Sequence, residues 1–225
     1  MKPVVRPRLL LAALGLLLLL AVWLSLALGP VSLPLGETLR AGLRLLGVPL
    51  DGAGLERAEL ILGQIRVPRT LLGLAVGAVL ALTGVSMQGL FRNPLADPGL
   101  VGVSSGAAMG AAFAIVLGAA WGGLPEVLAP YLLSASAFAG GLLVTGLVFR
   151  LGRRAGQTSV AYMLLAGVAL TALSGAVIGL LTYLADDATL RSLTFWNLGS
   201  LNGASYARLW PLLLVAASVA LWLPR

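Results

Sequence analysis

Long stretches without a charged residue constrain this chain more than any other feature. The run from Leu9 to Gly29 contains no Asp, Glu, Lys or Arg, and similar runs recur along the 225 residues. A helix of about 20 apolar residues crosses the hydrocarbon core of a bilayer. Only 10% of the residues are charged and 59% are hydrophobic, which leaves too little polar surface for a water-soluble globule. The sequence therefore predicts an all-α, polytopic transmembrane helical bundle.

Six spans are expected, separated by charged or by proline- and glycine-rich segments. The first five cover about residues 9–29, 70–91, 101–117, 127–149 and 158–185, and the sixth begins near Leu209. The first resembles a signal peptide, but it has no convincing cleavage site, and we expect an uncleaved helix. Residues 30–65 are too polar to cross, so we expect an external loop with short interfacial helices. Residues 1–225 are expected to form a single transmembrane domain.

The arginines test the orientation, because short cytoplasmic loops are rich in Lys and Arg. With the N-terminus inside, the inner segments hold one acid, Asp97, and eight basic residues: Lys2, Arg6, Arg8, Arg92, Arg150, Arg153, Arg154 and Arg225. The outer segments hold seven basic and seven acidic residues. This asymmetry favours a cytoplasmic N-terminus. It also accounts for the net charge of +7 without nucleic-acid binding, which we do not expect.

Cysteine and histidine are absent from the chain. This excludes the usual zinc sites, histidine-ligated haem and nucleophiles of the Cys/His or Ser-His-Asp type. No Gly-x-x-x-x-Gly-Lys-Ser/Thr loop is present, so the chain itself is not expected to hydrolyse ATP. We therefore expect no catalytic residue, metal site or cofactor in this chain.

Small residues recur every four positions inside the predicted spans. Such stripes let helix backbones approach closely in lipid. The candidates for helix packing are Gly73, Gly77, Gly102, Gly106, Gly110, Gly167 and Gly175. Packing alone is sufficient to explain them, and Gly102 to Gly106 is not a dinucleotide fingerprint because no strand precedes it.

Two arginines stand at the outer mouth of the second span, against the charge bias. Arg66 and Arg69 lie three residues apart around Pro68, which suits the first turn of a helix. This spacing is expected to place both guanidinium groups on one side, facing external water. Two interpretations stay open: snorkelling to lipid phosphate, or docking of an acidic partner through bidentate contacts.

The segment between the second and third spans contains two prolines and a glycine, Asn93-Pro94-Leu95-Ala96-Asp97-Pro98-Gly99. It cannot continue a helix. Non-helical backbone at membrane depth survives only where protein or water satisfies its polar groups. An ordinary cytoplasmic hairpin is the alternative to a pore lining, but so dense a turn indicates a fixed shape.

Three motifs together resemble one family. They are Arg66-x-Pro68-Arg69-Thr70; Met87-Gln88-x-Leu90-Phe91-x-Asn93-Pro94-Leu95-Ala96-x-Pro98-x-Leu100-x-Gly102-Val103-Ser104-x-Gly106; and Leu190-Arg191-x-Leu193-Thr194-Phe195-Trp196-x-x-Gly199-Ser200-Leu201. The chain resembles the FecCD family of ABC permeases over nearly all of residues 9–225, and the third motif is most similar to the haem permeases. The family imports cobalamin, haem and ferric siderophores.

The resemblance implies roles for individual residues. Arg66 and Arg69 match the arginines that meet glutamates of a solute-binding protein. Asn93, Leu95 and Ser159 match the cytoplasmic gate, although Val160 departs from the hydroxyl residue of the cobalamin importer.

At the outer end of the fifth span, Asp186 stands where that importer has a threonine of the periplasmic gate. For Asp186 and its neighbour Asp187, a solvated loop remains the alternative.

The resemblance also implies an assembly and a function. Permeases of this type II class have about ten helices per subunit, so six spans are present, and we expect the chain to be truncated before the coupling helices that grip the ATPase. The implied partners are a second permease subunit, ATPase subunits that use ATP and Mg, a periplasmic or lipid-anchored binding protein, and membrane lipid. The implied function is import of iron chelates across the bacterial inner membrane. Haem is favoured over ferric siderophore, and cobalamin stays open.

Two other classes fit the sequence less well. A membrane-embedded transferase commonly needs paired acidic motifs for Mg²⁺, and the only adjacent acids are Asp186 and Asp187. A secondary transporter usually places ionisable residues inside its spans, and the spans as predicted contain none.

Overall fold

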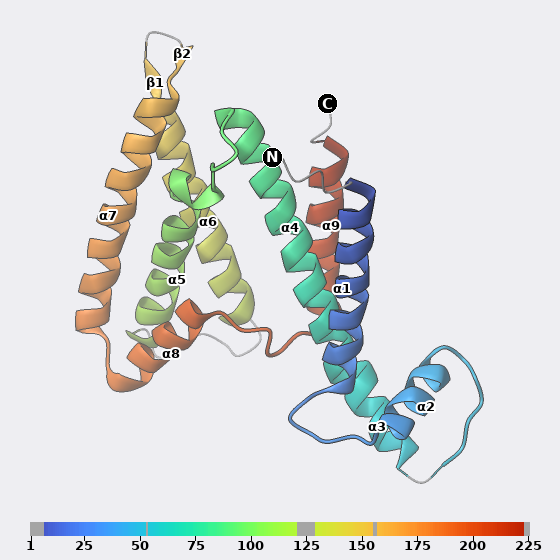
Figure 1. Cartoon of the computed structure of the whole chain (residues 1–225). Helices are drawn as coiled ribbons and strands as arrows, with labels where there is room; N and C mark the ends of the chain where they lie inside the picture. The colour runs from blue at the N-terminus through green and yellow to red at the C-terminus, as the bar shows by residue number, and fades with distance from the viewer. Residues whose placement is uncertain (1–6, 53, 121–128, 155–156, 223–225) are drawn as a thin grey trace. The chain divides into compact units, whose positions relative to one another are not determined.

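Figure 1 shows a computed structural model of the chain, which describes residues 7–52, 54–120, 129–154 and 157–222. The chain divides into two compact units. Unit 1 comprises Met1–Leu80 and Leu201–Arg225, and unit 2 comprises Ala81–Ser200. Lys2, Arg6 and Arg225 lie outside the described residues, as do residues 121–128 between the third and fourth predicted spans.

Unit 1 is built from helices that the apolar runs predict, together with shorter ones between them. Its elements are α1 (Pro7–Ala27), α2 (Leu35–Leu45), α3 (Leu55–Ile61), the π-helical segment η1 (Leu62–Arg66), the first half of α4 (Val67–Phe91) and α9 (Tyr206–Trp222). The helices α2 and α3 are the short helices expected within residues 30–65. Because α3, η1 and α4 follow one another without a break, Leu55–Phe91 forms one continuous helix of 37 residues.

The core of unit 1 lies between α2 and α3. Ala41 of α2 packs there against Leu55 and Ala58 of α3, and all three side chains are at most 2% exposed. Arg44 and Glu59 form an ion pair across the same two helices, with 3.3 Å between Nε and Oε2. One side of α2 is therefore fixed to α3.

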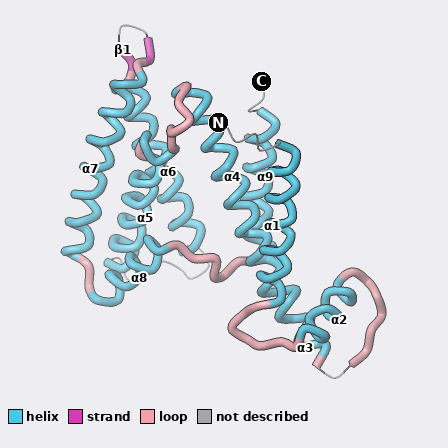
Figure 2. The backbone as a smooth tube through the Cα atoms, in the orientation of Figure 1, coloured by secondary structure: helices cyan, strands magenta, loops and turns pink. Residues whose placement is uncertain are grey.

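Unit 2 contains the end of α4 and a bundle of further helices. Its other elements are the 3₁₀ turn η2 (Pro98–Val101), α5 (Val103–Ala120), α6 (Ala129–Leu151), β1 (Arg153–Arg154), β2 (Gln157–Thr158), α7 (Val160–Leu184) and α8 (Asp187–Leu198). The strands are only two residues long and pair antiparallel, Arg153 with Thr158, between α6 and α7 (Figure 2). The predicted all-α class is confirmed apart from this small hairpin.

Among the described residues, four helices are long and apolar enough to cross a membrane: Pro7–Ala27, Leu55–Phe91, Tyr131–Leu151 and Val160–Leu184. The third and sixth predicted spans correspond to shorter apolar helices, Val103–Ala119 and Leu209–Ser218. All six predicted spans thus coincide with apolar helices in the described part of the chain, and four of them have the full length of a crossing.

The helices α5 and α6 touch backbone to backbone. A Cβ added to Gly106 of α5 would lie 2.5 Å from the carbonyl oxygen of Gly140 in α6. A Cβ on Gly110 would meet the carbonyl oxygen of Ser136. Only glycine permits such an approach, and the close packing that it allows is the usual source of helix association in lipid.

Candidate functional site

Arg66 is buried, with 5% of its surface exposed. Its Nη1 donates hydrogen bonds to the carbonyl oxygens of Leu26 (2.7 Å) and Ala27 (2.8 Å), and its Nη2 donates to that of Val31 (2.6 Å). The last carbonyl groups of a helix have no partner within the helix, and a cation is favourable beside them. The guanidinium group therefore caps the C-terminal end of α1. The expectation that Arg66 faces external water is wrong, whereas its role in docking stays untested.

Arg69, one turn further on, is exposed. It lines a groove of about 730 Å³ together with Ser25, Val31, Ile65 and Asn202. Within the described chain no hydrogen bond or ion pair engages its guanidinium group. Arg69 is therefore the member of the arginine pair that is available to an acidic partner.

The π-helical segment η1 explains how Pro68 fits inside a continuous helix. A proline has no N–H and its ring clashes with the carbonyl of the preceding turn, which normally kinks or ends a helix. In η1 the N–H of Val67 donates to the carbonyl of Leu62, five residues earlier. The next bond of this register would run from residue 68 to the carbonyl of Gly63, and Pro68 cannot make it.

Tyr206 of α9 supplies the missing donor. Its phenolic O–H donates to the carbonyl oxygen of Gly63 at 2.9 Å. The wide turn thus accommodates Pro68, whose side chain is fully buried. The carbonyl of Gly63, which Pro68 leaves without a backbone donor, is satisfied by a side chain of another helix. Wide turns of this kind are often found at functional sites. Here it lies directly before Arg69.

The turn at residues 92–99 has a fixed shape, as predicted. The Oδ1 of Asn93 accepts from the backbone N–H of Leu95 at 2.9 Å, and the Oδ1 of Asp97 accepts from that of Gly99 at 2.7 Å. Arg92, in the left-handed region with φ of 49°, closes the end of α4. These contacts leave Leu95 exposed over 85% of its surface.

The turn is attached to the bundle through Ala96, which is buried. It shares a cluster with Phe91, Val101, Val148 of α6 and Met163 of α7. Ser159, at the start of α7, accepts through its carbonyl oxygen from the N–H of Met163 at 3.0 Å. The residues matched to the cytoplasmic gate, Asn93, Leu95 and Ser159, therefore gather at one end of unit 2.

Asp186 caps the N-terminus of α8. Its Oδ1 accepts from the backbone N–H of Thr189 at 2.8 Å, as in a typical helix N-cap. Hydrogen bonding to Thr189 lowers the pKa of the Asp186 carboxyl below its ordinary value of 3.8. Asp186 is also exposed, which agrees with the alternative interpretation of a solvated residue. Its place in a gate stays a prediction.

The glycines proposed for packing differ in their surroundings. Besides Gly106 and Gly110, a Cβ on Gly102 would lie 2.7 Å from Val144, and one on Gly167 would meet the carbonyl oxygen of Leu100. At Gly73 the nearest atom, Cδ1 of Leu201, is at an ordinary 3.7 Å. Gly77 and Gly175 meet nothing within 4 Å in the described chain, and for these two a packing role stays a prediction.

These features define a multi-pass helical membrane protein. In one unit a buried arginine caps the end of a helix close to an exposed arginine, and in the other unit a proline-containing turn has a fixed shape. The chain belongs to the FecCD transport family, whose model matches residues 17–224. It thus joins the family that the three sequence motifs indicate.

Individual relatives agree with this family. The hemin transport system permease protein HmuU of Yersinia pestis is 48% identical over 158 residues, which cover 70% of this chain and 45% of the relative. The vitamin B12 import system permease protein BtuC of Citrobacter koseri is 39% identical over 213 residues, 95% of this chain and 57% of the relative. The chain thus spans about half the length of these relatives.

One solved structure is similar over most of the chain. It is described as an inward-facing conformation of a metal-chelate type ABC transporter. The TM-score is 0.71 at 32% sequence identity, and the match covers 95% of this chain and 61% of that one. The fold of this chain is therefore that of an ABC transporter permease.

Proposed function

We propose that this chain is part of the permease subunit of a binding-protein-dependent ABC importer for iron chelates. The observation that carries the proposal is the family match over residues 17–224, supported by the fold shared with a metal-chelate type ABC transporter. The substrate passes between helices and no reaction occurs on this chain. Hydrolysis of ATP with Mg belongs to separate cytoplasmic subunits, and a second permease subunit completes the path.

Haem is the substrate that we favour. The support is the 48% identity to a hemin permease, against 39% to a vitamin B12 permease. The vitamin B12 relatives match over more of the chain, 95% against 70%, which keeps cobalamin as the second candidate.

A transport assay separates these substrates. The protein that contains this chain is reconstituted in liposomes with its ATPase and binding protein, and uptake of labelled hemin, cobalamin and a ferric siderophore is measured with and without ATP. We expect ATP-dependent uptake of hemin. Uptake of cobalamin alone would replace the substrate, and uptake of none of the three with an intact ATPase would remove the import proposal.

We assign docking of the solute-binding protein to Arg69. It is exposed and carries a guanidinium group without a partner in the described chain, whereas that of Arg66 holds the end of α1. The change Arg69→Glu should weaken the binding protein's affinity because it replaces attraction to a carboxylate by repulsion. Arg57→Glu on α3 is the matched control, since it alters the same charge at another exposed site. Equal affinities for both variants would refute this assignment.

The proposed orientation places the turn at residues 92–99 in the cytoplasm with the N-terminus. In unit 2, the hairpin of β1 and β2 and the start of α8 lie at opposite ends (Figure 1). Arg150 and Arg153 belong to the end of α6 and to β1, whereas Asp186 and Asp187 stand at the start of α8. That distribution follows the bias of cytoplasmic loops toward basic residues.

The absence of cysteine makes the orientation simple to test in inner-membrane vesicles of known sidedness. A membrane-impermeant thiol reagent should label Leu95→Cys only from the cytoplasmic face and Arg57→Cys only from the other. The reverse pattern would contradict the orientation, because the proposed cytoplasmic gate would then face the periplasm and the proposed docking residue Arg69 would face the cytoplasm.

A further inference from the structure

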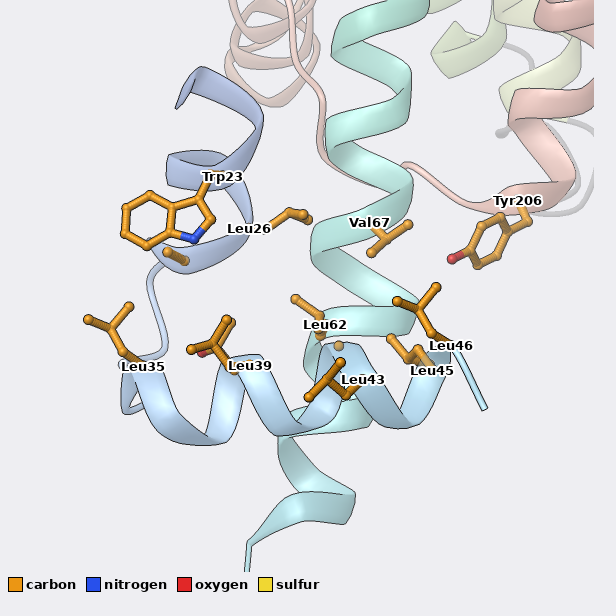
Figure 3. Close-up of a pocket in the computed structure, with 13 residues that line it drawn as sticks. Trp23, Leu26, Leu35, Leu39, Leu43, Leu45, Leu46, Leu62, Val67 and Tyr206 are labelled. Atoms are coloured by element: carbon orange, nitrogen blue, oxygen red, sulfur yellow. The ribbon is translucent and has the colours of Figure 1, made fainter. Parts of the chain in front are cut away.

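An apolar pocket of about 560 Å³ lies between α2 and the ends of α1 and α4 (Figure 3). The side of α2 that does not pack on α3 lines it with leucines, among them Leu39 and Leu43. From the other side it is lined by Trp23 and Leu26 of α1 and by Val67. Its volume falls within the range of about 300–1,000 Å³ that holds small-molecule ligands.

Neither of the two hydroxyl groups in the pocket has a proton left to donate to a ligand. Thr38 donates through Oγ1 to the carbonyl of Pro34 at 3.3 Å, and Tyr206 donates to that of Gly63 at 2.9 Å. The other side chains that line it, apart from Trp23, are aliphatic. An apolar cavity does not hold ordered water. This mostly aliphatic lining therefore favours a hydrocarbon group as the occupant.

The surface of α1 leads into this pocket. Its leucines stay exposed along the helix, and no residue in the most apolar stretch of α1 is buried within the described chain. Where α1 crosses a bilayer, the part of this surface that no further helix covers faces lipid, and the surface ends at Trp23, which is 48% exposed at the pocket. Tryptophan is enriched at the level of lipid headgroups, where its ring lies in apolar surroundings and its N–H meets polar ones.

The arrangement of α2 agrees with a position at the membrane surface. Leu35, Leu39 and Leu43 recur at helical spacing on one face, whereas Glu37 and Arg44 lie on the opposite face. Figure 3 shows these leucines on the side of α2 that faces α1 and α4, and α2 running across the direction of α4. Amphipathic helices of this kind lie in the plane of the interface with their apolar face toward the acyl chains.

We propose that this pocket binds one acyl chain of a membrane phospholipid from the leaflet at the C-terminal end of α1, with the indole N–H of Trp23 toward the headgroup. The acyl chain would run along α1 and end beneath α2. The site depends only on insertion of α1 in a bilayer, and not on which substrate the protein carries.

Two glycines of α2 provide a matched pair of variants. Gly42 lines the pocket, and a Cβ there has only Cδ2 of Leu62 within 4 Å, at 3.8 Å. Gly36 does not line it, and a Cβ there meets nothing within 4 Å. Gly42→Leu therefore fills the pocket, whereas Gly36→Leu adds the same side chain to the same helix outside it.

The experiment measures lipid retained by the purified protein in native mass spectrometry during stepwise washing with detergent. We expect wild type and Gly36→Leu to keep one phospholipid at a detergent concentration that removes it from Gly42→Leu. We expect the affinity for the lipid to fall by at least about tenfold in Gly42→Leu, which corresponds to about 1.4 kcal/mol. Leu43→Gln places an amide in the pocket and should also lose the phospholipid at this detergent concentration. It replaces Gly42→Leu in the experiment if Gly42→Leu does not fold.

A second measurement locates the lipid. In a protein with Trp23 as its only tryptophan, phospholipids brominated on the acyl chain should quench fluorescence less in Gly42→Leu than in Gly36→Leu. Equal retention and equal quenching in all variants would overturn the proposal. A doubled mass that Gly42→Leu alone abolishes would also overturn it, because a second copy of the chain would then occupy the pocket.

Discussion

The phenolic oxygen of Tyr206 lies 2.9 Å from the carbonyl oxygen of Gly63, which precedes it by 143 residues. This one hydrogen bond joins the start of α9 to the wide turn before α4. It satisfies a carbonyl that Pro68 leaves without a donor. Tyr206, far along the sequence, therefore stabilises the wide turn that precedes Arg69 in the long helix.

We predict that Tyr206→Phe lowers the free energy of unfolding by about 1 kcal/mol, the usual net value of a hydrogen bond, or more where the carbonyl stays unsatisfied. The cost should shrink when Pro68→Ala restores a backbone N–H at residue 68. Thermal unfolding of the two single variants and the double variant in detergent gives the coupling. Additive effects would show that Tyr206 does not replace the missing N–H.

Removing the buried guanidinium group should be far more harmful than removing the exposed one. Arg66→Ala removes the donor from two carbonyl groups at the end of α1 and from that of Val31 in the following loop, and we expect a loss of about 1.5–3 kcal/mol. Arg69→Ala should change stability by less than about 0.5 kcal/mol. Hydrogen exchange should show faster exchange after α1 only in Arg66→Ala. Comparable losses of stability would contradict the capping role.

The close contact of α5 and α6 predicts a strong effect of a single methyl group. Gly106→Ala places its Cβ against the carbonyl of Gly140, so the helices must separate, at a cost of about 1–3 kcal/mol. Gly175→Ala, in the open part of α7, should be neutral or stabilising by up to about 1 kcal/mol, because alanine is the better helix former. The thermal unfolding temperature distinguishes them. A Gly106→Ala protein as stable as wild type would refute the contact.

The cap of α8 should make this helix sensitive to acid. The folded state lowers the pKa of Asp186 below 3.8, so its stabilising contribution is complete well above that value and is lost as the pH falls through the lowered pKa. Asp186→Asn keeps an acceptor that does not titrate, and its α8 should stay protected where that of wild type opens. Asp186→Ala should open α8 at all pH values. Hydrogen exchange of α8 against pH measures this, and identical profiles for wild type and Asp186→Asn would exclude the carboxylate as the cause.

The spans were predictable because hydrophobic length alone determines them. The second and fifth, expected at 70–91 and 158–185, correspond to Val67–Phe91 and Val160–Leu184. The shape of the proline turn was also predictable, since Asn93 and Asp97 make hydrogen bonds to residues only two positions away. Local chemistry of this kind can be read directly from a sequence.

The burial of Arg66 was not predictable, because its acceptors are backbone carbonyls 35 to 40 residues earlier, which any sequence provides. The continuous helix through Pro68 was missed for a similar reason. It depends on a wide turn and on Tyr206, which are far apart in the sequence. The helix α8 was also missed, although Asp186, directly before it, is a typical capping residue that indicates where a helix starts.

The contact between Gly106 and Gly140 restricts how α5 and α6 can move relative to each other. Sliding between packed helices normally proceeds through small changes of side-chain rotamers at their interface. Here no side chain separates the two backbones, so such small adjustments are not available. We therefore expect α5 and α6 to travel together as one rigid body, and any opening of a path to occur along their other faces.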